Sequence, residues 1–103
     1  MTQERKTQIY SWIKDETASL MSDRKYKLFV FGSQANKEIL SNSDIDIGID
    51  AGKPIEDNLI SRLWNKLDDL PTLYSFDIVD FQLVEDRFKK VSLKNIEILH
   101  DGL

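Results

Sequence analysis

The sequence predicts an α/β (α+β) fold in which helices and strands alternate along the chain. Three segments carry this prediction. Over 2–21, apolar residues recur at helical spacing among charged ones, which predicts an amphipathic helix: Ile9, Trp12, Ile13 and Leu20. The run 27–31 is apolar after Lys27 and ends at Gly32, which is typical of a short strand buried on both faces. The third segment, 43–50, alternates strictly between isoleucine and small or acidic residues.

The alternating segment predicts a strand with one apolar face, formed by Ile45, Ile47 and Ile49. A turn over 51–54 should follow it. Leucine and isoleucine at helical spacing then predict a helix over 59–70, which stops before Pro71.

The rest of the chain completes one small domain. Aromatic and β-branched residues predict a third strand over 74–84, and a short helix should cover 86–94. Residues 96–99 fit either a closing strand or a continued helix. The polar segment 33–42 has room for no more than about a turn of helix. We therefore expect a single domain over 1–103.

Composition excludes several classes of protein. A net charge of −4 argues against a protein that wraps nucleic acid by neutralising phosphates. The chain has no cysteine and one histidine, His100, so disulfides, the usual zinc clusters and a Ser-His-Asp hydrolase are not expected. Its start is polar and no apolar run is long enough to span a membrane, so we expect a cytoplasmic protein.

Acidic residues gather in the middle of the sequence and point to carboxylate chemistry. The segment 44–86 has a net charge of −8, against +2 on each side. Asp44 and Asp46 project from the same face of the second strand, with Cα atoms about 6 to 7 Å apart. Asp77 interrupts an apolar strand and is the best third carboxylate. Three such carboxylates repel one another, and Mg²⁺ or Mn²⁺ would remove that repulsion.

A second feature predicts an anion site. Gly32 and Ser33 fall where the first strand ends and a short helix should begin, so backbone N–H groups there can bind a phosphate. Carboxylate-bound metal beside a phosphate site is the arrangement that phosphoryl or nucleotidyl transfer requires. Neither a P-loop nor a dinucleotide-binding glycine motif is present.

Other conspicuous residues have simpler interpretations. Asp50 is expected to open the turn at Gly52, and Asp80 to lie on the other face from Asp77 or at the strand margin. His100 is expected at the surface near the end of the chain. The two tryptophans, Trp12 and Trp64, are interpreted as core or interface residues. The basic residues are interpreted as solubilising surface charge, with contact to phosphate or to an acidic partner as the less favoured alternative: Arg24, Lys25, Lys27, Arg87, Lys89, Lys90 and Lys94.

Together, Gly32-Ser33 and Ser43-Asp44-Ile45-Asp46 resemble the signature of the polymerase β nucleotidyltransferase superfamily. The length resembles that of its minimal nucleotidyltransferases (MNT), and the segment 75–80 resembles the third motif. The resemblance implies a palm-like mixed sheet of three to four strands flanked by helices. It also implies that Gly32 and Ser33 bind the triphosphate of ATP, that Asp44 and Asp46 hold two Mg²⁺ ions, and that Asp77 completes the metal site and helps to activate the acceptor hydroxyl.

The same resemblance implies a partner. Minimal family members typically act as antitoxins that transfer AMP from ATP to a tyrosine of a HEPN toxin. This chain departs from the family pattern at Gln34 and Lys37, where many members have arginine and glycine. Two alternatives stay open: a non-catalytic antitoxin that masks its partner by contact, and an enzyme that modifies a small molecule. Homo- and hetero-oligomers both stay open.

Overall fold

The computed structural model describes residues 3–32 and 44–103, and these residues form a mixed four-stranded sheet with helices on both faces. The elements in chain order are α1 (Gln3–Met21), β1 (Lys27–Phe31), β2 (Ile45–Asp50), α2 (Asp57–Asp68), β3 (Phe76–Asp80), α3 (Asp86–Ser92) and β4 (Glu97–Asp101). The order across the sheet is β3-β2-β1-β4. Strand β1 is antiparallel to β2 and β4, whereas β2 and β3 are parallel. The predicted fold class is therefore confirmed.

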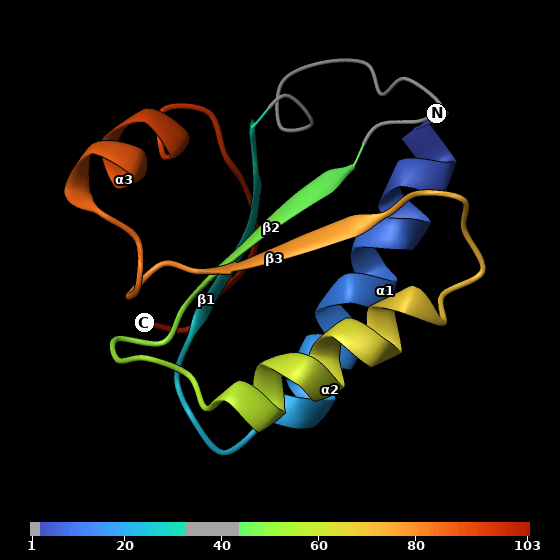
Figure 1. Cartoon of the computed structure of the whole chain (residues 1–103). Helices are drawn as coiled ribbons and strands as arrows, with labels where there is room; N and C mark the ends of the chain where they lie inside the picture. Colours follow the sequence, from blue (N-terminus) through green and yellow to red (C-terminus); the bar gives the residue numbers. More distant parts are fainter. Residues whose placement is uncertain (1–2, 33–43) are drawn as a thin grey trace.

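One face of the sheet is covered by the two longer helices. Helices α1 and α2 lie together on the same side (Figure 1). Alternate residues of the strands point into this layer, and the isoleucines of β2 are fully buried there. The predicted alternation of β2 is thus confirmed, because a side-chain period of two sends every second residue into this core. Among the described helices, none is long and apolar enough to cross a membrane.

The opposite face carries a smaller, aromatic layer under α3. Phe29 and Phe31 of β1 pack with Phe81, with ring centroids 4.8 and 5.2 Å from the Phe81 ring. Phe88 of α3 covers this cluster at 6.0 Å from Phe31 and 5.9 Å from Phe81. Edge-to-face pairs of this kind are favourable because the ring edge is positive and the ring face negative.

The third strand is shorter than the sequence predicts. It was expected over 74–84, but β3 ends at Asp80 because the chain turns there. The Asp80 carboxylate accepts hydrogen bonds from the backbone N–H groups of Gln82, at 3.0 Å, and Ile55, at 2.8 Å. Beyond the turn, Phe81 is buried in the aromatic layer, whereas Leu83 is 67% exposed. The predicted strand is therefore too long, and not all of its apolar residues are buried.

The first strand and the two tryptophans lie as the sequence predicts, whereas His100 does not. The first strand has the predicted bounds, and the closing segment is a strand, β4, rather than a continued helix. His100 lies within β4, half-buried against Tyr26 at a ring distance of 4.5 Å, so its expected place at the surface near the chain end is wrong. Trp12 and Trp64 pack against the main core, as expected. The helical turn predicted over 33–42 lies outside the described residues.

Gly48 makes the aromatic layer possible. A Cβ atom built at this position would lie 2.3 Å from Cε2 of Phe29 and 2.7 Å from Cε1 of Phe81. The two rings therefore occupy the space that any other residue would need. This requirement comes from packing, since the backbone of Gly48 lies in a regular strand.

We expect Gly48→Ala to lower the free energy of unfolding by about 1 to 3 kcal/mol, because an added methyl group in a filled core displaces its neighbours. Urea unfolding followed by circular dichroism would measure the change. An unchanged unfolding midpoint would contradict the packing requirement.

Candidate functional site

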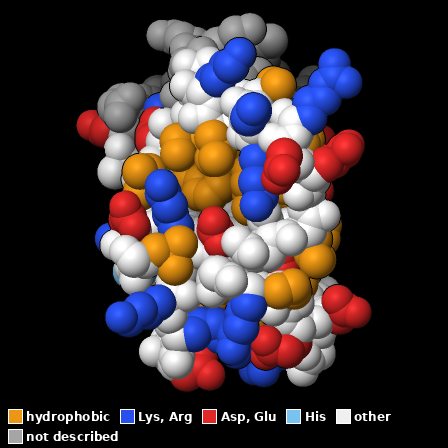
Figure 2. Space-filling view, turned by 90° about the vertical axis from the view of Figure 1, so that its left-hand side faces the viewer, with side chains coloured by type: hydrophobic (Ala, Val, Ile, Leu, Met, Phe, Trp, Pro, Cys, Tyr) orange, Lys and Arg blue, Asp and Glu red, His pale blue; other side chains and the backbone are white. Residues whose placement is uncertain are grey.

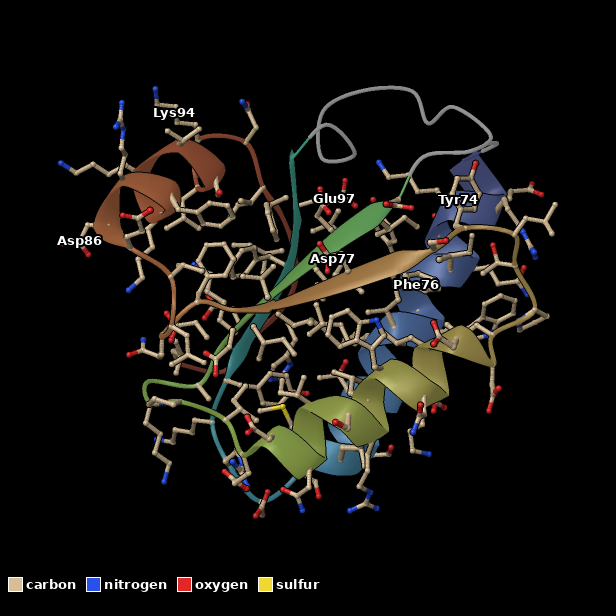
Figure 3. The ribbon with its side chains drawn as sticks, viewed as in Figure 1. Tyr74, Phe76, Asp77, Asp86, Lys94 and Glu97 are labelled. Atoms are coloured by element: carbon tan, nitrogen blue, oxygen red, sulfur yellow. The ribbon has the colours of Figure 1, made fainter. Side chains whose placement is uncertain are left out.

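The site predicted from the sequence lies where β2 and β3 run side by side. Asp46 of β2 and Asp77 of β3 are directly paired in the parallel register. Both point away from α1 and α2, because their neighbours Ile45, Ile47 and Phe76 are buried against those helices. Neighbouring strands are about 4.8 Å apart, so the two carboxylates start from adjacent positions. Figure 3 shows Asp77 on β3 next to β2, with Asp86 and Lys94 on and just beyond α3, across the sheet face.

Asp44 precedes β2 by one residue and falls on the same side as Asp46. Asp44 and Asp77 are exposed, whereas Asp46 is half-buried. Burial raises the pKa of the Asp46 carboxyl, and the negative charges of Asp77 and Asp44 raise it further. The structure therefore brings the three predicted aspartates within electrostatic reach of one another.

The three carboxylates have no cationic partner among the described residues. No Lys or Arg within 3–32 and 44–103 forms an ion pair with any of them. In the same residues, no three acidic or histidine side chains are arranged so that they could hold a metal ion together. The donors are all carboxylate oxygens, which are the ligands that Mg²⁺ prefers. Burial, and then the charges of Asp77 and Asp44, disfavour the ionised form of Asp46. The chemistry of these donors suits magnesium, whereas the described side chains are not arranged around one point.

Gly32 stands directly over the Asp46 carboxylate. Its φ is +76°, in the left-handed region, and a Cβ atom there would lie 2.7 Å from Oδ2 of Asp46. The positive φ and the lack of room for a Cβ atom therefore both require glycine directly after β1. The structure brings Gly32 next to the carboxylates, as the sequence predicts. Ser33, Gln34 and Lys37 lie outside the described residues.

Asp50 and Asp80 have the structural roles predicted for them. Asp50 accepts a hydrogen bond from the backbone N–H of Gly52 at 2.9 Å and one from Nε2 of Gln82 at 2.8 Å. Asp80 ends β3 on the face opposite Asp77 and holds two backbone N–H groups, as described above. Of the five aspartates in or next to β2 and β3, Asp50 and Asp80 therefore stabilise turns.

The aromatic neighbour of the site was missed by the sequence analysis. Phe31 is paired with Asp46 across β1 and β2, and Phe88 of α3 packs on Phe31. The sequence contains a signal for this layer, because Phe29 and Phe31 lie on one face of β1 and the residue paired with Phe29 on β2 is Gly48. It could not be interpreted without knowing that β1 and β2 are neighbours and that α3 returns over them.

The chain matches the family model for the polymerase β nucleotidyltransferase domain over residues 17–101. The matched region contains both predicted motifs and Asp77. The chain belongs to the polymerase β nucleotidyltransferase family. No curated protein matches it.

Solved structures share its fold at low sequence identity. A chain of a mutant MntA–HpeT toxin–antitoxin complex is 20% identical, with a TM-score of 0.67 over 85% of this chain and 73% of that one. A second comes from the complex of a tri-AMPylated Shewanella oneidensis HEPN toxin with MNT antitoxin; it is 18% identical, with a TM-score of 0.62 over 89% and 72% of the two chains. A third, also from Shewanella oneidensis, is 20% identical, with a TM-score of 0.62 over 86% and 70%.

The crowded carboxylates of this member of the nucleotidyltransferase family should cost stability. Because the folded state raises the pKa of Asp46 above its ordinary value near 3.8, folding favours the protonated carboxyl. Stability due to this group is therefore lost as the pH rises through the raised pKa. Without divalent ions, we expect Asp46→Asn to stabilise the fold at neutral pH by less than about 1 kcal/mol, since water screens a half-exposed charge. Thermal unfolding at pH 7 and at pH 3 would show a gain only at the higher pH.

Asp80→Ala is the matched control for this prediction. It also removes an aspartate next to β2, but one that satisfies two backbone N–H groups. We expect it to destabilise the fold by about 1 to 3 kcal/mol. Loss of stability in both variants at neutral pH would refute the repulsion at Asp46.

Proposed function

We propose that this protein is a magnesium-dependent nucleotidyltransferase that transfers AMP from ATP to a tyrosine hydroxyl of a HEPN toxin, and so acts as its antitoxin. One observation carries the proposal: Asp46 and Asp77 are paired on adjacent strands, with Asp44 close enough to raise the pKa of Asp46. Membership of the nucleotidyltransferase family supports the reaction class. The fold shared with a complex that contains a tri-AMPylated HEPN toxin and its MNT antitoxin supports the partner and the transferred group.

In the proposed reaction, the tyrosine oxygen attacks the α-phosphorus of ATP. The bond between that phosphorus and the oxygen leading to the β-phosphate breaks, and pyrophosphate leaves with that oxygen. The phenolic proton passes to a carboxylate and then to water. Asp77 suits this role, because its side chain is exposed and can reach an acceptor that approaches from outside.

Asp44 and Asp46 would hold two magnesium ions, with Asp77 as the third ligand. Magnesium, when bound, would neutralise the charge of the phosphates and of the departing pyrophosphate. The positive charge would also keep Asp46 ionised in spite of its burial. Gly32, with Ser33, would bind the triphosphate, and the absence of a side chain at Gly32 leaves the backbone open to an anion beside Asp46.

Replacing both residues of the pair, Asp44→Asn with Asp46→Asn, should lower AMP transfer by at least about 100-fold, because the charges that position the phosphates are lost. The measurement is transfer of radiolabelled AMP from ATP to the proposed HEPN partner. Asp50→Asn is the matched control, since it removes the same charge from the same strand at a residue that holds a turn. Full activity of the double variant would rule out the proposed chemistry.

Calorimetry gives a second test that does not depend on the acceptor. We expect the wild-type chain to take up Mg²⁺ in the presence of a non-hydrolysable ATP analogue, and the double variant to bind at least about 10-fold more weakly, a difference of about 1.4 kcal/mol. Absence of Mg²⁺ uptake by the wild-type chain would contradict the metal site. A double variant that still neutralised the toxin in cells would favour the non-catalytic antitoxin instead.

A further inference from the structure

Helix α3 presents an apolar surface that the fold leaves uncovered. None of its residues is buried, and Val91 and Phe88 are 64% and 39% exposed. Leu83, in the turn that leads into the helix, is 67% exposed. Figure 2 shows hydrophobic side chains gathered on this side of the molecule, with Lys and Arg and some Asp and Glu side chains around them. We call Leu83, Phe88 and Val91, with the basic residues Arg87, Lys90 and Lys94, the α3 surface.

The α3 surface is continuous with the candidate active site. Phe88 packs on Phe31 at 6.0 Å, and Phe31 is paired with Asp46 in the sheet. The opposite face of the sheet is closed by α1 and α2 (Figure 1). Among the described residues, Asp77 points to the face of the sheet that carries α3, so a macromolecule that brings an acceptor hydroxyl to Asp77 would approach on that face.

The charge of the α3 surface indicates the kind of partner. Arg87, Lys90 and Lys94 are exposed, and none of them forms an ion pair with any described residue. Residues 83–94 carry four basic residues against Glu85 and Asp86, so this segment is net positive in a chain whose net charge is −4. An apolar centre with a charged rim is the usual composition of a protein interface. The complementary surface has apolar side chains surrounded by Asp and Glu.

We propose that the α3 surface docks the acceptor protein, which presents an acidic-rimmed apolar patch next to the hydroxyl that is modified. This inference rests on the proposed function, because it concerns the substrate of that same site. Docking here would hold the acceptor near Asp77 and would remove Val91 and Leu83 from water. The apolar centre would supply affinity, and the lysines and arginine would speed association and make it sensitive to salt.

Val91→Asp tests the centre of the surface. The side chain is mostly exposed, so the substitution should leave the fold intact, while it places a negative charge against an acidic partner. We expect affinity for the proposed HEPN partner to fall at least about 10-fold, measured by calorimetry without ATP. Leu73→Asp is the matched control: Leu73 is 96% exposed and lies in the loop before β3, on the other side of the molecule. Its affinity should stay within about 2-fold of the wild type.

The outcomes separate the docking surface from the reaction. Val91→Asp should still take up Mg²⁺ with the ATP analogue, because the aspartates are unchanged. If Val91→Asp binds the partner as tightly as the wild type, or if Leu73→Asp loses as much affinity, the docking surface is wrong while the proposed function stands. If the wild-type chain neither binds nor modifies the HEPN protein, both the proposed function and the docking surface are wrong. If Val91→Asp instead turns a dimer of this chain into monomers in sedimentation, the surface pairs two copies and the proposal is overturned.

Discussion

The half-buried carboxylate of Asp46 is the feature on which the arrangement of the candidate site depends. It lies between Phe31 and Asp77 in the sheet and beneath the backbone of Gly32, and no described cation offsets its charge. A folded protein usually lowers the pKa of its carboxyls, because they gain partners on folding. Here the pKa is raised, by burial first and by two neighbouring aspartates second. A partly buried carboxylate beside two like charges is typical of a functional site.

The two faces of the sheet differ in thickness and in the residues that they carry. The face under α1 and α2 holds most of the buried aliphatic side chains and one internal hydrogen bond of note, from Oγ1 of Thr17 to the carbonyl of Ile13 at 2.7 Å. The other face is thinner, with three buried phenylalanines and a helix of seven residues. A thin layer leaves the carboxylates accessible, and it also leaves α3 with apolar side chains in water.

At the end of the sheet away from Asp46 and Asp77, loop positions depend on polar contacts between distant parts of the sequence. Arg24 donates two hydrogen bonds to Glu56, at 2.8 and 3.0 Å, and so joins the turn after α1 to the start of α2. The guanidinium lowers the pKa of the Glu56 carboxyl to about 2. Asp80 fixes the same connection from the other side through the backbone N–H of Ile55. From the sequence, Arg24 is expected to be solubilising surface charge, because nothing in the order of residues shows that it contacts Glu56.

Patterns within one segment were sufficient for much of this protein. Alternating isoleucines determined which side of β2 is buried, helical spacing determined α1 and α2, and the apolar run before Gly32 gave β1 its bounds, because these periods follow from backbone geometry alone. That Asp44, Asp46 and Asp77 lie near one another was also predictable, since a charge in an apolar strand is costly. Tertiary structure alone decided the parallel register that sets Asp77 beside Asp46, the end of β3 at Asp80, the aromatic layer over Gly48 and the place of His100. Each of these depends on contacts between segments far apart in the chain, and such contacts leave no period in the sequence.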